Sequence, residues 1–459
     1  MVKYHNHPGF VRRLMSVLVV LLLVAGAGTL WATGEQEEGA GGEMAELLFT
    51  YWGSPIEREA VENMLDAFNA EFTDIQVRGE HVPDAYEERM STMLAGGNPP
   101  DVAYMAEGLA MQWFEEGVLL DLTDYFENDP KAANRLETTY YRTEEGRTLG
   151  TNTAAETMVL YYRKDLFDAA GLPYPPSRAE EAWTWDEFVE VAQRLTVDTN
   201  GNDATSSAFN PDNVDTYGIV FPQWWGGYTP LIYSNNGRVV NEEGTELLLN
   251  QPEAIEVLEA MQDLIYVHNA APTPAEAASM PSANVMMQAG RVAMEIGGHW
   301  SVLDYSQLDM DWSVGVLPMF ERPVTMILGA PTVIFEATEY PEQAFTFYKW
   351  HNDPEYVDLF RKGLWMPLNI EYYTDPGTTA EWLDSEPGVY PEESRDVFVD
   401  YTLDNTPVQP SVYWLRNWGQ INNEVITPAM QLIWTNEATP QEAMDQAVQD
   451  ARSLLQGRW

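Results

Sequence analysis

Two neighbouring segments decide the fold: Val-Leu-Tyr-Tyr-Arg-Lys-Asp-Leu-Phe-Asp-Ala-Ala-Gly-Leu at residues 159–172, and Thr-Trp-Asp-Glu-Phe-Val-Glu-Val-Ala-Gln-Arg-Leu-Thr at residues 184–196. Residues 159–162 form a short apolar run of β-prone side chains, which predicts a buried strand. Residues 165–170 are compatible with a helix, and Gly171 is placed to end it. The first segment therefore predicts a strand that passes directly into a short helix.

The second segment predicts an amphipathic helix with a defined start. Thr184 and Glu187 have the spacing of a capping box, in which both side chains satisfy backbone N–H groups at the helix start. One face of this helix is apolar, with residues recurring at helical spacing at Phe188, Val191, Ala192 and Leu195. A strand followed by a capped helix is common in proteins, so the specific residues of the two segments are more informative than the order of the elements.

Short β-prone runs and helical patterns alternate over most of the chain. Strands are expected at residues 47–52, 75–82, 101–105, 217–221, 292–296 and 313–317. Helices are expected at residues 58–72, 84–95, 252–267, 342–351, 355–360 and 440–456. The alternation indicates an α/β fold with mostly parallel sheets flanked by helices. About 420 residues are too many for one simple core, so two lobes are expected.

The first residues predict export. Residues 1–33 combine three basic side chains and no acid with a short apolar run and small residues, as in a signal peptide. An uncleaved anchor is the alternative, but the run is shorter than the roughly 20 apolar residues of a transmembrane helix. Residues 34–46 are rich in Gly and Glu, which predicts a flexible leader. Since the chain has no cysteine that could carry a lipid, we expect a free periplasmic protein and not a lipoprotein.

The composition limits the possible partners. The chain has 72 acidic and 24 basic residues, and its formal net charge is −48. Because binding phosphates requires basic surface, we expect no nucleic-acid partner. Abundant acid with scarce lysine fits a salt-adapted surface, although a merely acidic secreted protein would look the same. Without disulfides, a large hydrophobic core must hold the fold.

Five motifs resemble those of extracellular solute-binding proteins of the maltose-binding-protein type. One is the opening pair of segments, with Tyr-Tyr-Arg-Lys-Asp-Leu-Phe followed by Thr-Trp-Asp-Glu-Phe. The others lie at residues 97–102, 114–123, 216–218 and 287–300, and all five follow the family's order. The resemblance covers nearly the whole chain after the leader.

The resemblance implies a two-lobed periplasmic-binding-protein fold, similar to type II, in which the chain crosses a hinge more than once. By analogy, the N-terminal lobe is placed at residues 45–153 plus 318–350. The C-terminal lobe is placed at residues 154–317 plus 351–459. The hinge is expected near Asn152 to Glu156, Leu317 and Trp350.

Tryptophan is the main chemical signal, with 16 in the chain. Flat aromatic faces suit the apolar faces of sugar rings, and carboxylates and amides bind the sugar hydroxyls. The candidates are tryptophans at strand ends or in loops: Trp52, Trp224, Trp225, Trp300, Trp365, Trp414 and Trp418. Tryptophans in helical contexts are assigned to packing: Trp113, Trp183, Trp185, Trp350 and Trp434. Packing is also the alternative for each candidate.

The resemblance adds three candidate ligand contacts. Tyr104 and Glu107 follow the Pro-Asp-Val strand, although Glu107 could equally be a solvated surface acid. Glu156 matches a position at the lobe junction where the maltose-binding relative uses a glutamate on sugar hydroxyls. Trp300 and Trp414 match that relative's stacking tryptophans. Met105 replaces an expected aromatic residue, which puts maltodextrin in doubt as the ligand.

No cofactor or metal site is expected. The segment Asp198-Thr-Asn-Gly-Asn-Asp203 is a cluster of oxygen ligands with faint calcium-loop character. Its spacing is not that of an EF-hand, so a plain Asx turn is the better interpretation.

Two functional hypotheses follow. The first is a periplasmic binding protein that captures a sugar or oligosaccharide between two lobes and delivers it to the membrane permease of an ABC importer, acting as a monomer and not as an enzyme. The alternative is a secreted glycoside hydrolase or other carbohydrate-active enzyme, which would also use tryptophans and paired carboxylates. With so many acids, candidate carboxylate pairs are unavoidable and do not favour the second hypothesis.

Overall fold

The computed structural model describes residues 44–405 and 409–459. The expected signal peptide at residues 1–33 and most of the expected leader lie outside the described residues. Residues 44–459 group into one compact unit.

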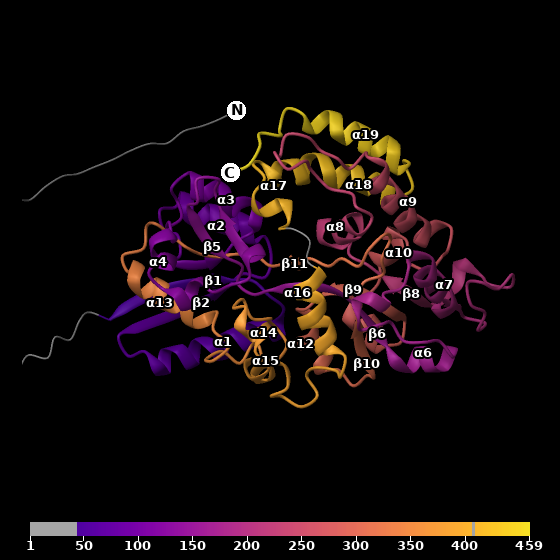
Figure 1. The fold of residues 1–459 in the computed structure, drawn as a ribbon, viewed down its shortest axis with the longest axis horizontal. Coiled ribbons are helices and arrows are strands. Elements are labelled where there is room, and N and C mark those ends of the chain that lie inside the picture. The colour runs from indigo at the N-terminus through magenta and orange to yellow at the C-terminus, as the bar shows by residue number, and fades with distance from the viewer. Residues whose placement is uncertain (1–43, 406–408) are drawn as a thin grey trace, which may run out of the picture. The chain divides into compact units, whose positions relative to one another are not determined.

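The strands and helices are numbered as in Figure 1. The strands are β1 (Ala45–Tyr51), β2 (Ile75–His81), β3 (Val102–Tyr104), β4 (Tyr140–Arg142), β5 (Thr148–Thr151), β6 (Glu156–Arg163), β7 (Val197–Asp198), β8 (Val214–Val220), β9 (Val292–Gly298), β10 (Trp312–Gly315), β11 (Ile327–Leu328) and β12 (Thr332–Ile334). The helices up to the middle of the chain are α1 (Pro55–Glu71), α2 (Tyr86–Ala95), α3 (Glu107–Glu115), α4 (Thr123–Glu127), α5 (Pro130–Ala133), α6 (Lys164–Ala170), α7 (Trp185–Leu195), α8 (Trp225–Ser234) and α9 (Pro252–Tyr266). The later helices are α10 (Pro274–Ala277), α11 (Ala283–Gln288), α12 (Ser301–Ser306), α13 (Pro341–His351), α14 (Glu371–Thr374), α15 (Pro376–Leu383), α16 (Thr402–Asn405), α17 (Trp418–Ile421), α18 (Thr427–Trp434) and α19 (Pro440–Ala451).

The first sheet has the order β12-β3-β1-β2. Its three early strands are parallel, and β12 joins the edge antiparallel to β3. Helix α1 begins at a capping box of Ser54 and Glu57 and buries Val61, Met64, Leu65 and Phe68. Helix α13 contacts both α1 and β12, so a segment from far along the chain completes this layer (Figure 1).

The second sheet has the order β10-β6-β9-β8-β7, with β11 also pairing with β6. The expectation of mostly parallel strands is wrong for this sheet, since only β8 and β9 among its described pairs are parallel. The cause is the direction of β6. This strand starts at Glu156 opposite the end of β9, where Met158 pairs with Gly298, so it runs against its neighbours.

The decisive segments fold as predicted. All eight residues of β6 are buried, and Gly171 ends α6 in the left-handed conformation with φ 65°. Thr184 and Glu187 form the predicted capping box of α7. Its predicted apolar face, Phe188, Val191, Ala192 and Leu195, is buried.

Two predicted helices are corrected. Residues 355–360 form successive turns and not a helix. The buried side chains there are Val357, Leu359 and Phe360, a spacing that one helical face cannot provide, so packing overrides helix propensity. The last helix ends at Ala451 and not at residue 456, because the tail turns back to pair through Gly457 with Gly244.

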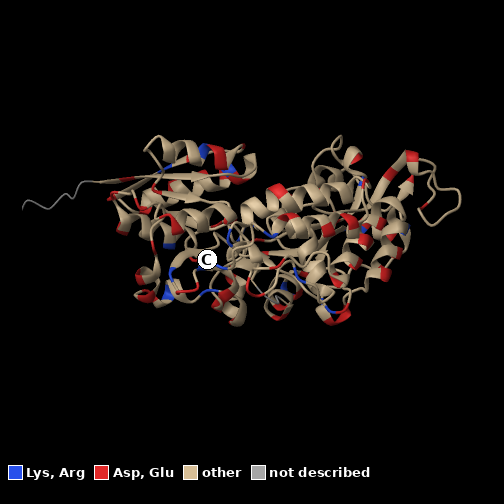
Figure 2. Ribbon diagram, turned by 90° about the horizontal axis from the view of Figure 1, so that it is seen from above, with Lys and Arg blue, Asp and Glu red and all other residues tan. Residues whose placement is uncertain are grey.

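Acidic positions are spread over the helices and loops of the described chain, and basic positions are few (Figure 2). Within residues 44–405 and 409–459, no helix has both the length and the apolar character needed to cross a membrane.

Candidate functional site

A cavity of about 250 Å³ is built from both sheets. We call it the cleft cavity. It is lined by Trp52, Glu57, Val61, Tyr104, Glu107, Thr153, Ala154, Glu156, Trp224, Trp300, Leu328, Gly329, Ala330, Leu364 and Trp365. Seven of the ten candidate residues are therefore brought together: Trp52, Tyr104, Glu107, Glu156, Trp224, Trp300 and Trp365. Trp418, the first residue of α17, is not among the lining residues.

The first sheet contributes one side of the cleft cavity. Trp52 follows the last residue of β1, Tyr104 is the last residue of β3, and Glu107 is the first residue of α3. The carboxyl ends of parallel strands meet at one edge of a sheet, which is why residues so far apart in sequence converge. The ring centroids of Trp52 and Tyr104 lie 5.4 Å apart in an edge-to-face contact, so the aromatic wall is packed.

The second sheet contributes the other side. Glu156 is the first residue of β6, and Trp300 lies just beyond the end of β9. The antiparallel pairing of these two strands places the start of one beside the end of the other. Trp224 precedes α8, and its ring centroid lies 6.4 Å from that of Trp300. Two indole rings and a carboxyl group thus face the same cavity.

Trp225 and Trp414 do not line this cavity. Trp225 makes edge-to-face contacts with Trp224 and Trp418, at centroid distances of 5.2 and 6.2 Å. Trp414 lies in a different cavity, where the guanidinium carbon of Arg458 is 3.9 Å from the ring centroid. The C-terminal tail lies beside this residue, because the backbone N–H of Trp459 donates a hydrogen bond to the backbone carbonyl of Trp414.

Glu57 is the main residue that the sequence analysis missed. It lies in the first turn of α1, where its carboxylate accepts a hydrogen bond from the Ser54 backbone N–H. The Ser-x-x-Glu spacing would have identified a capping box, but it does not reveal that this carboxylate also faces a cavity.

The cavity carboxyls are held in surroundings that disfavour their charge. Burial raises the pKa of Glu107 to about 7. Burial raises the pKa of Glu156 well above its usual range, and the charge of Glu57 raises it further. Burial also raises the pKa of Glu57, against the lowering effect of the hydrogen bond from Ser54.

Two oxygens at the cavity have no hydrogen-bond partner among the described residues: Glu156 Oε2 and the Tyr104 hydroxyl. Glu156 is 7% exposed and Tyr104 is 5% exposed. The nearest basic group to Glu156 is His299, whose Nδ1 lies 3.8 Å from Oε2. Burial lowers the pKa of His299 to about 3, so the imidazole is neutral and does not compensate the carboxylate.

Residues 52–358 match the family of bacterial extracellular solute-binding proteins. The chain belongs to this family. It is 22% identical over 361 residues to the maltotriose-binding protein of Pyrococcus abyssi, a match that covers 75% of this chain and 70% of the relative. It is also 22% identical over 448 residues to the sn-glycerol-3-phosphate-binding periplasmic protein of Shigella dysenteriae, covering 90% and 94% of the two chains.

Solved structures show the same fold. An ABC substrate-binding protein from Listeria monocytogenes, solved in complex with cycloalternan, superposes with a TM-score of 0.75 at 22% identity. The match covers 89% of this chain and 98% of the other. The solute-binding protein therefore has the predicted two-lobed α/β fold.

A second cavity of the solute-binding protein, about 240 Å³, adjoins the cleft cavity. Both cavities are lined by Trp224 and Trp300. The adjoining cavity also contains Glu295, and burial raises the pKa of this side chain to about 8, with the charge of Asp304 as a further cause. The site therefore continues past the two tryptophans.

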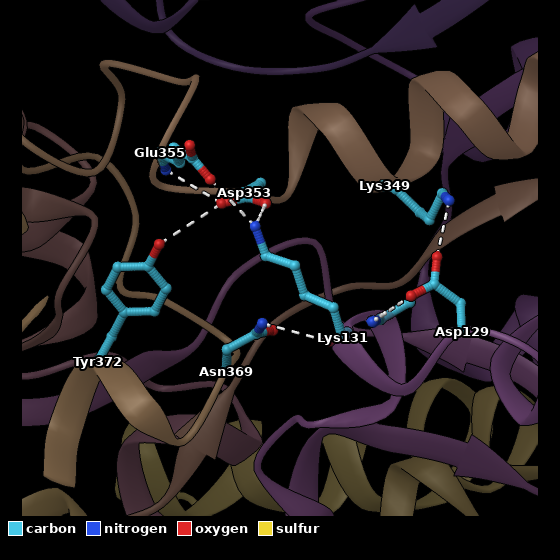
Figure 3. Close-up of polar contacts among 8 residues, drawn as sticks. Asp129, Lys131, Lys349, Asp353, Glu355, Asn369 and Tyr372 are labelled. Carbon is cyan, nitrogen blue, oxygen red and sulfur yellow. Dashed lines mark hydrogen bonds and ion pairs between the residues drawn. The ribbon is translucent and has the colours of Figure 1, made fainter. Parts of the chain in front are cut away.

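A third cavity, about 270 Å³, lies between α5 and α13 and has a different chemistry. We call it the ion-pair cavity. Lys131 Nζ lies 2.8 Å from Asp353 and 3.1 Å from Glu355, and Lys349 Nζ lies 2.7 Å from Asp129 (Figure 3). Both lysines are therefore paired with acids.

The segment from Asp198 to Asp203 of the solute-binding protein is a turn, as interpreted from the sequence. Asp198 Oδ1 accepts hydrogen bonds from the backbone N–H groups of Asn200 and Asn202, at 2.8 and 2.9 Å. The carboxylate is thus satisfied by its own loop. The described part of the chain contains no group of three acidic or histidine side chains placed to hold a metal.

Proposed function

We propose that this solute-binding protein captures a sugar or oligosaccharide in the cleft cavity and delivers it to the membrane permease subunits of an ABC importer. The observation that carries the proposal is the lining of the cavity, where Trp52 and Trp300 follow strands of different sheets and Glu156 is the first residue of β6. Indole faces suit the apolar faces of sugar rings, and carboxylates accept hydrogen bonds from sugar hydroxyls.

The named relatives support a carbohydrate ligand. One is a maltotriose-binding protein, and one neighbouring structure contains cycloalternan. The glycerol-phosphate-binding relative indicates that the family also accepts an anionic solute. In this chain such a ligand is disfavoured, because no basic side chain that could pair with a phosphate lines the cleft cavity.

The proposed mechanism is closure of two lobes. The N-terminal lobe comprises residues 45–153 plus 318–350, and the C-terminal lobe comprises residues 154–317 plus 351–459. A sugar that contacts both lobes favours the closed state by its differential affinity, and the importer then recognises that state. We place the protein free in the periplasm as a monomer.

A ligand screen tests the proposal. A sugar that binds the folded state raises its stability by about 2.7 kcal/mol at a concentration of 100 times Kd, so the melting temperature of the purified protein should rise. A parallel assay for new reducing ends should detect no product. Stabilisation by another solute class alone would contradict the sugar assignment, and steady release of reducing ends would favour a hydrolase.

A further inference from the structure

The side chains around the cleft cavity are unbalanced in charge and in hydrogen-bonding groups. Four glutamates line this cavity and its neighbour: Glu57, Glu107, Glu156 and Glu295. Among the residues that the structure describes (44–405 and 409–459), neither cavity is lined by a Lys, Arg, His, Asn or Gln side chain. The two cavities therefore hold four carboxyl groups and no basic side chain.

We propose that the sugar captured here carries a protonated amino group; this inference rests on the proposed sugar-binding function. The ammonium would lie near Glu156 and Glu57, which both line the cleft cavity, where no basic side chain is present. Glu156 Oε2, which has no partner among the described residues, would accept a hydrogen bond from it. The remainder of the ring would lie against the tryptophan faces.

Donor and acceptor balance favours an amine over a plain hydroxyl. Each sugar hydroxyl both donates and accepts, so a neutral sugar needs donors from the protein. The side-chain donors of the cleft cavity are the indole N–H groups of the four tryptophans and the hydroxyls of Tyr104 and Thr153, and Thr153 is already bonded to Thr332 at 2.8 Å. An ammonium group brings three donors and no acceptor, which fits a carboxyl-rich wall.

The aromatic lining supports the same ligand. Four tryptophans line the cleft cavity: Trp52, Trp224, Trp300 and Trp365. A cation within about 6 Å of an aromatic centroid is attracted by the ring face, and the attraction is stronger away from water. Aromatic faces thus bind a sugar ring and a cation equally well, whereas they offer nothing to an anion.

The cost of ionising a buried carboxyl group gives a third reason. Burial and the neighbouring charge of Glu57 both oppose ionisation of Glu156. The buried imidazole of His299 is neutral and supplies no compensation. A cationic ligand would supply an opposite charge, so its binding would favour the ionised form of Glu156 that burial disfavours in the empty protein.

Matched sugars test the inference by isothermal titration of the full-length protein. Glucosamine, galactosamine, mannosamine and chitosan oligosaccharides would be compared with their N-acetylated forms and with the parent sugars, which differ only at C2. An amino sugar is expected to bind at least about tenfold more tightly than either neutral counterpart, the size of one charged hydrogen bond. Choline and a polyamine would be included as cations that are not sugars.

The outcomes separate the two proposals. If a neutral sugar binds and no amino sugar binds more tightly, the inference is overturned and the sugar-binding function stands. If only a non-sugar solute binds, both are overturned.

Substitutions of single glutamates then identify which carboxyl group contacts the amino group of the ligand. Glu156→Gln keeps the shape of the protonated carboxyl and should weaken the amino sugar at least about tenfold while changing the neutral counterpart little. Glu57→Gln, which can keep the capping box of α1, serves the same purpose if the first variant does not fold. Glu259→Gln, on the exposed face of α9, is the control and should change neither. Equal loss of both sugars in the Glu156 variant would overturn the inference.

Discussion

The cleft cavity and the ion-pair cavity are similar in size and opposite in chemistry. They measure about 250 and 270 Å³. In the ion-pair cavity Lys131 and Lys349 each have a carboxylate within 3.1 Å, so their charges are neutralised within the protein. In the cleft cavity Glu156 and Glu107 have no cationic partner among the described residues. Charges that are paired hold segments together, whereas buried groups left without partners are available to a ligand.

The two cavities also differ in what they connect. In the ion-pair cavity, Lys131 of α5 ties itself to Asp353, just after α13, more than two hundred residues along the chain. In the cleft cavity the aromatic rings contact one another, but Glu156 Oε2 and the Tyr104 hydroxyl have no hydrogen-bond partner among the described residues. The ion-pair cavity therefore contributes to stability, and the cleft cavity is expected to gain its missing interactions when a ligand binds.

The largest expected effect comes from the aromatic wall. Trp300→Ala removes an indole face from the cleft cavity and its neighbour, so ligand affinity should fall by about 2 kcal/mol or more, as for a central interface residue. Isothermal titration with the sugar found in the thermal screen measures the loss. Trp414→Ala is the matched control, since this ring lies against Arg458 elsewhere. An equal loss in the control would place the ligand outside the cleft cavity.

A smaller effect is expected from pH. Burial raises the pKa of Glu107 from 4.5 to about 7, so the folded protein retains a proton that the unfolded chain releases. The stabilisation from this group is fully present below about pH 4.5 and is lost as the pH rises through about 7. Gln cannot ionise, so Glu107→Gln should avoid this loss. Compared with its effect at pH 4, the substitution should raise the free energy of unfolding at pH 8 by about 1 to 2 kcal/mol, a value reduced because Glu107 is partly exposed.

Urea unfolding at several pH values measures this difference. Glu259→Gln on α9 is the control, and its stability should follow that of the parent protein. If the Glu107 variant and the parent lose stability in parallel between pH 5 and pH 8, the carboxyl is not held in its protonated form.

The sequence predicted the residues that lie just beyond the ends of strands. Trp52 and Trp300 lie just beyond strand ends, and both were found there because apolar runs and their boundaries are local signals. Glu156 was predicted from the family resemblance. Glu57 was missed because the helix was predicted to begin at residue 58, whereas α1 begins at Pro55, and its Ser-x-x-Glu spacing would indicate only a capping box. Its second role depends on how the sheets meet.

Longer-range contacts explain the remaining differences. Trp414 was predicted to stack on ligand, and it lies outside the cleft cavity, where Arg458 of the C-terminal tail lies against its ring. The parallel order expected for the second sheet failed because β6 enters at the cleft and runs against its neighbours. Local sequence patterns determine neither where the C-terminal tail docks nor the direction in which β6 runs.

The smallest expected effect lies in the ion-pair cavity. Lys131→Met removes the pairs with Asp353 and Glu355 and should lower the free energy of unfolding by no more than about 1 kcal/mol, because the lysine side chain is 52% exposed and its pairs are screened. Ligand affinity should not change. A double-mutant cycle with Asp353→Asn isolates the pair, since each single variant also removes other contacts.

Salt gives the sharpest contrast between the cavities. At about 1 M salt the Debye length falls to about 3 Å, so the difference in unfolding free energy between the Lys131 variant and the parent should shrink towards zero. Glu107 is only partly exposed and its raised pKa comes mainly from burial, so the stabilisation gained by Glu107→Gln should fall less. If salt abolished both differences equally, the cleft carboxyls would be as solvated as the surface pairs, and the reason for their readiness to bind a ligand would be lost.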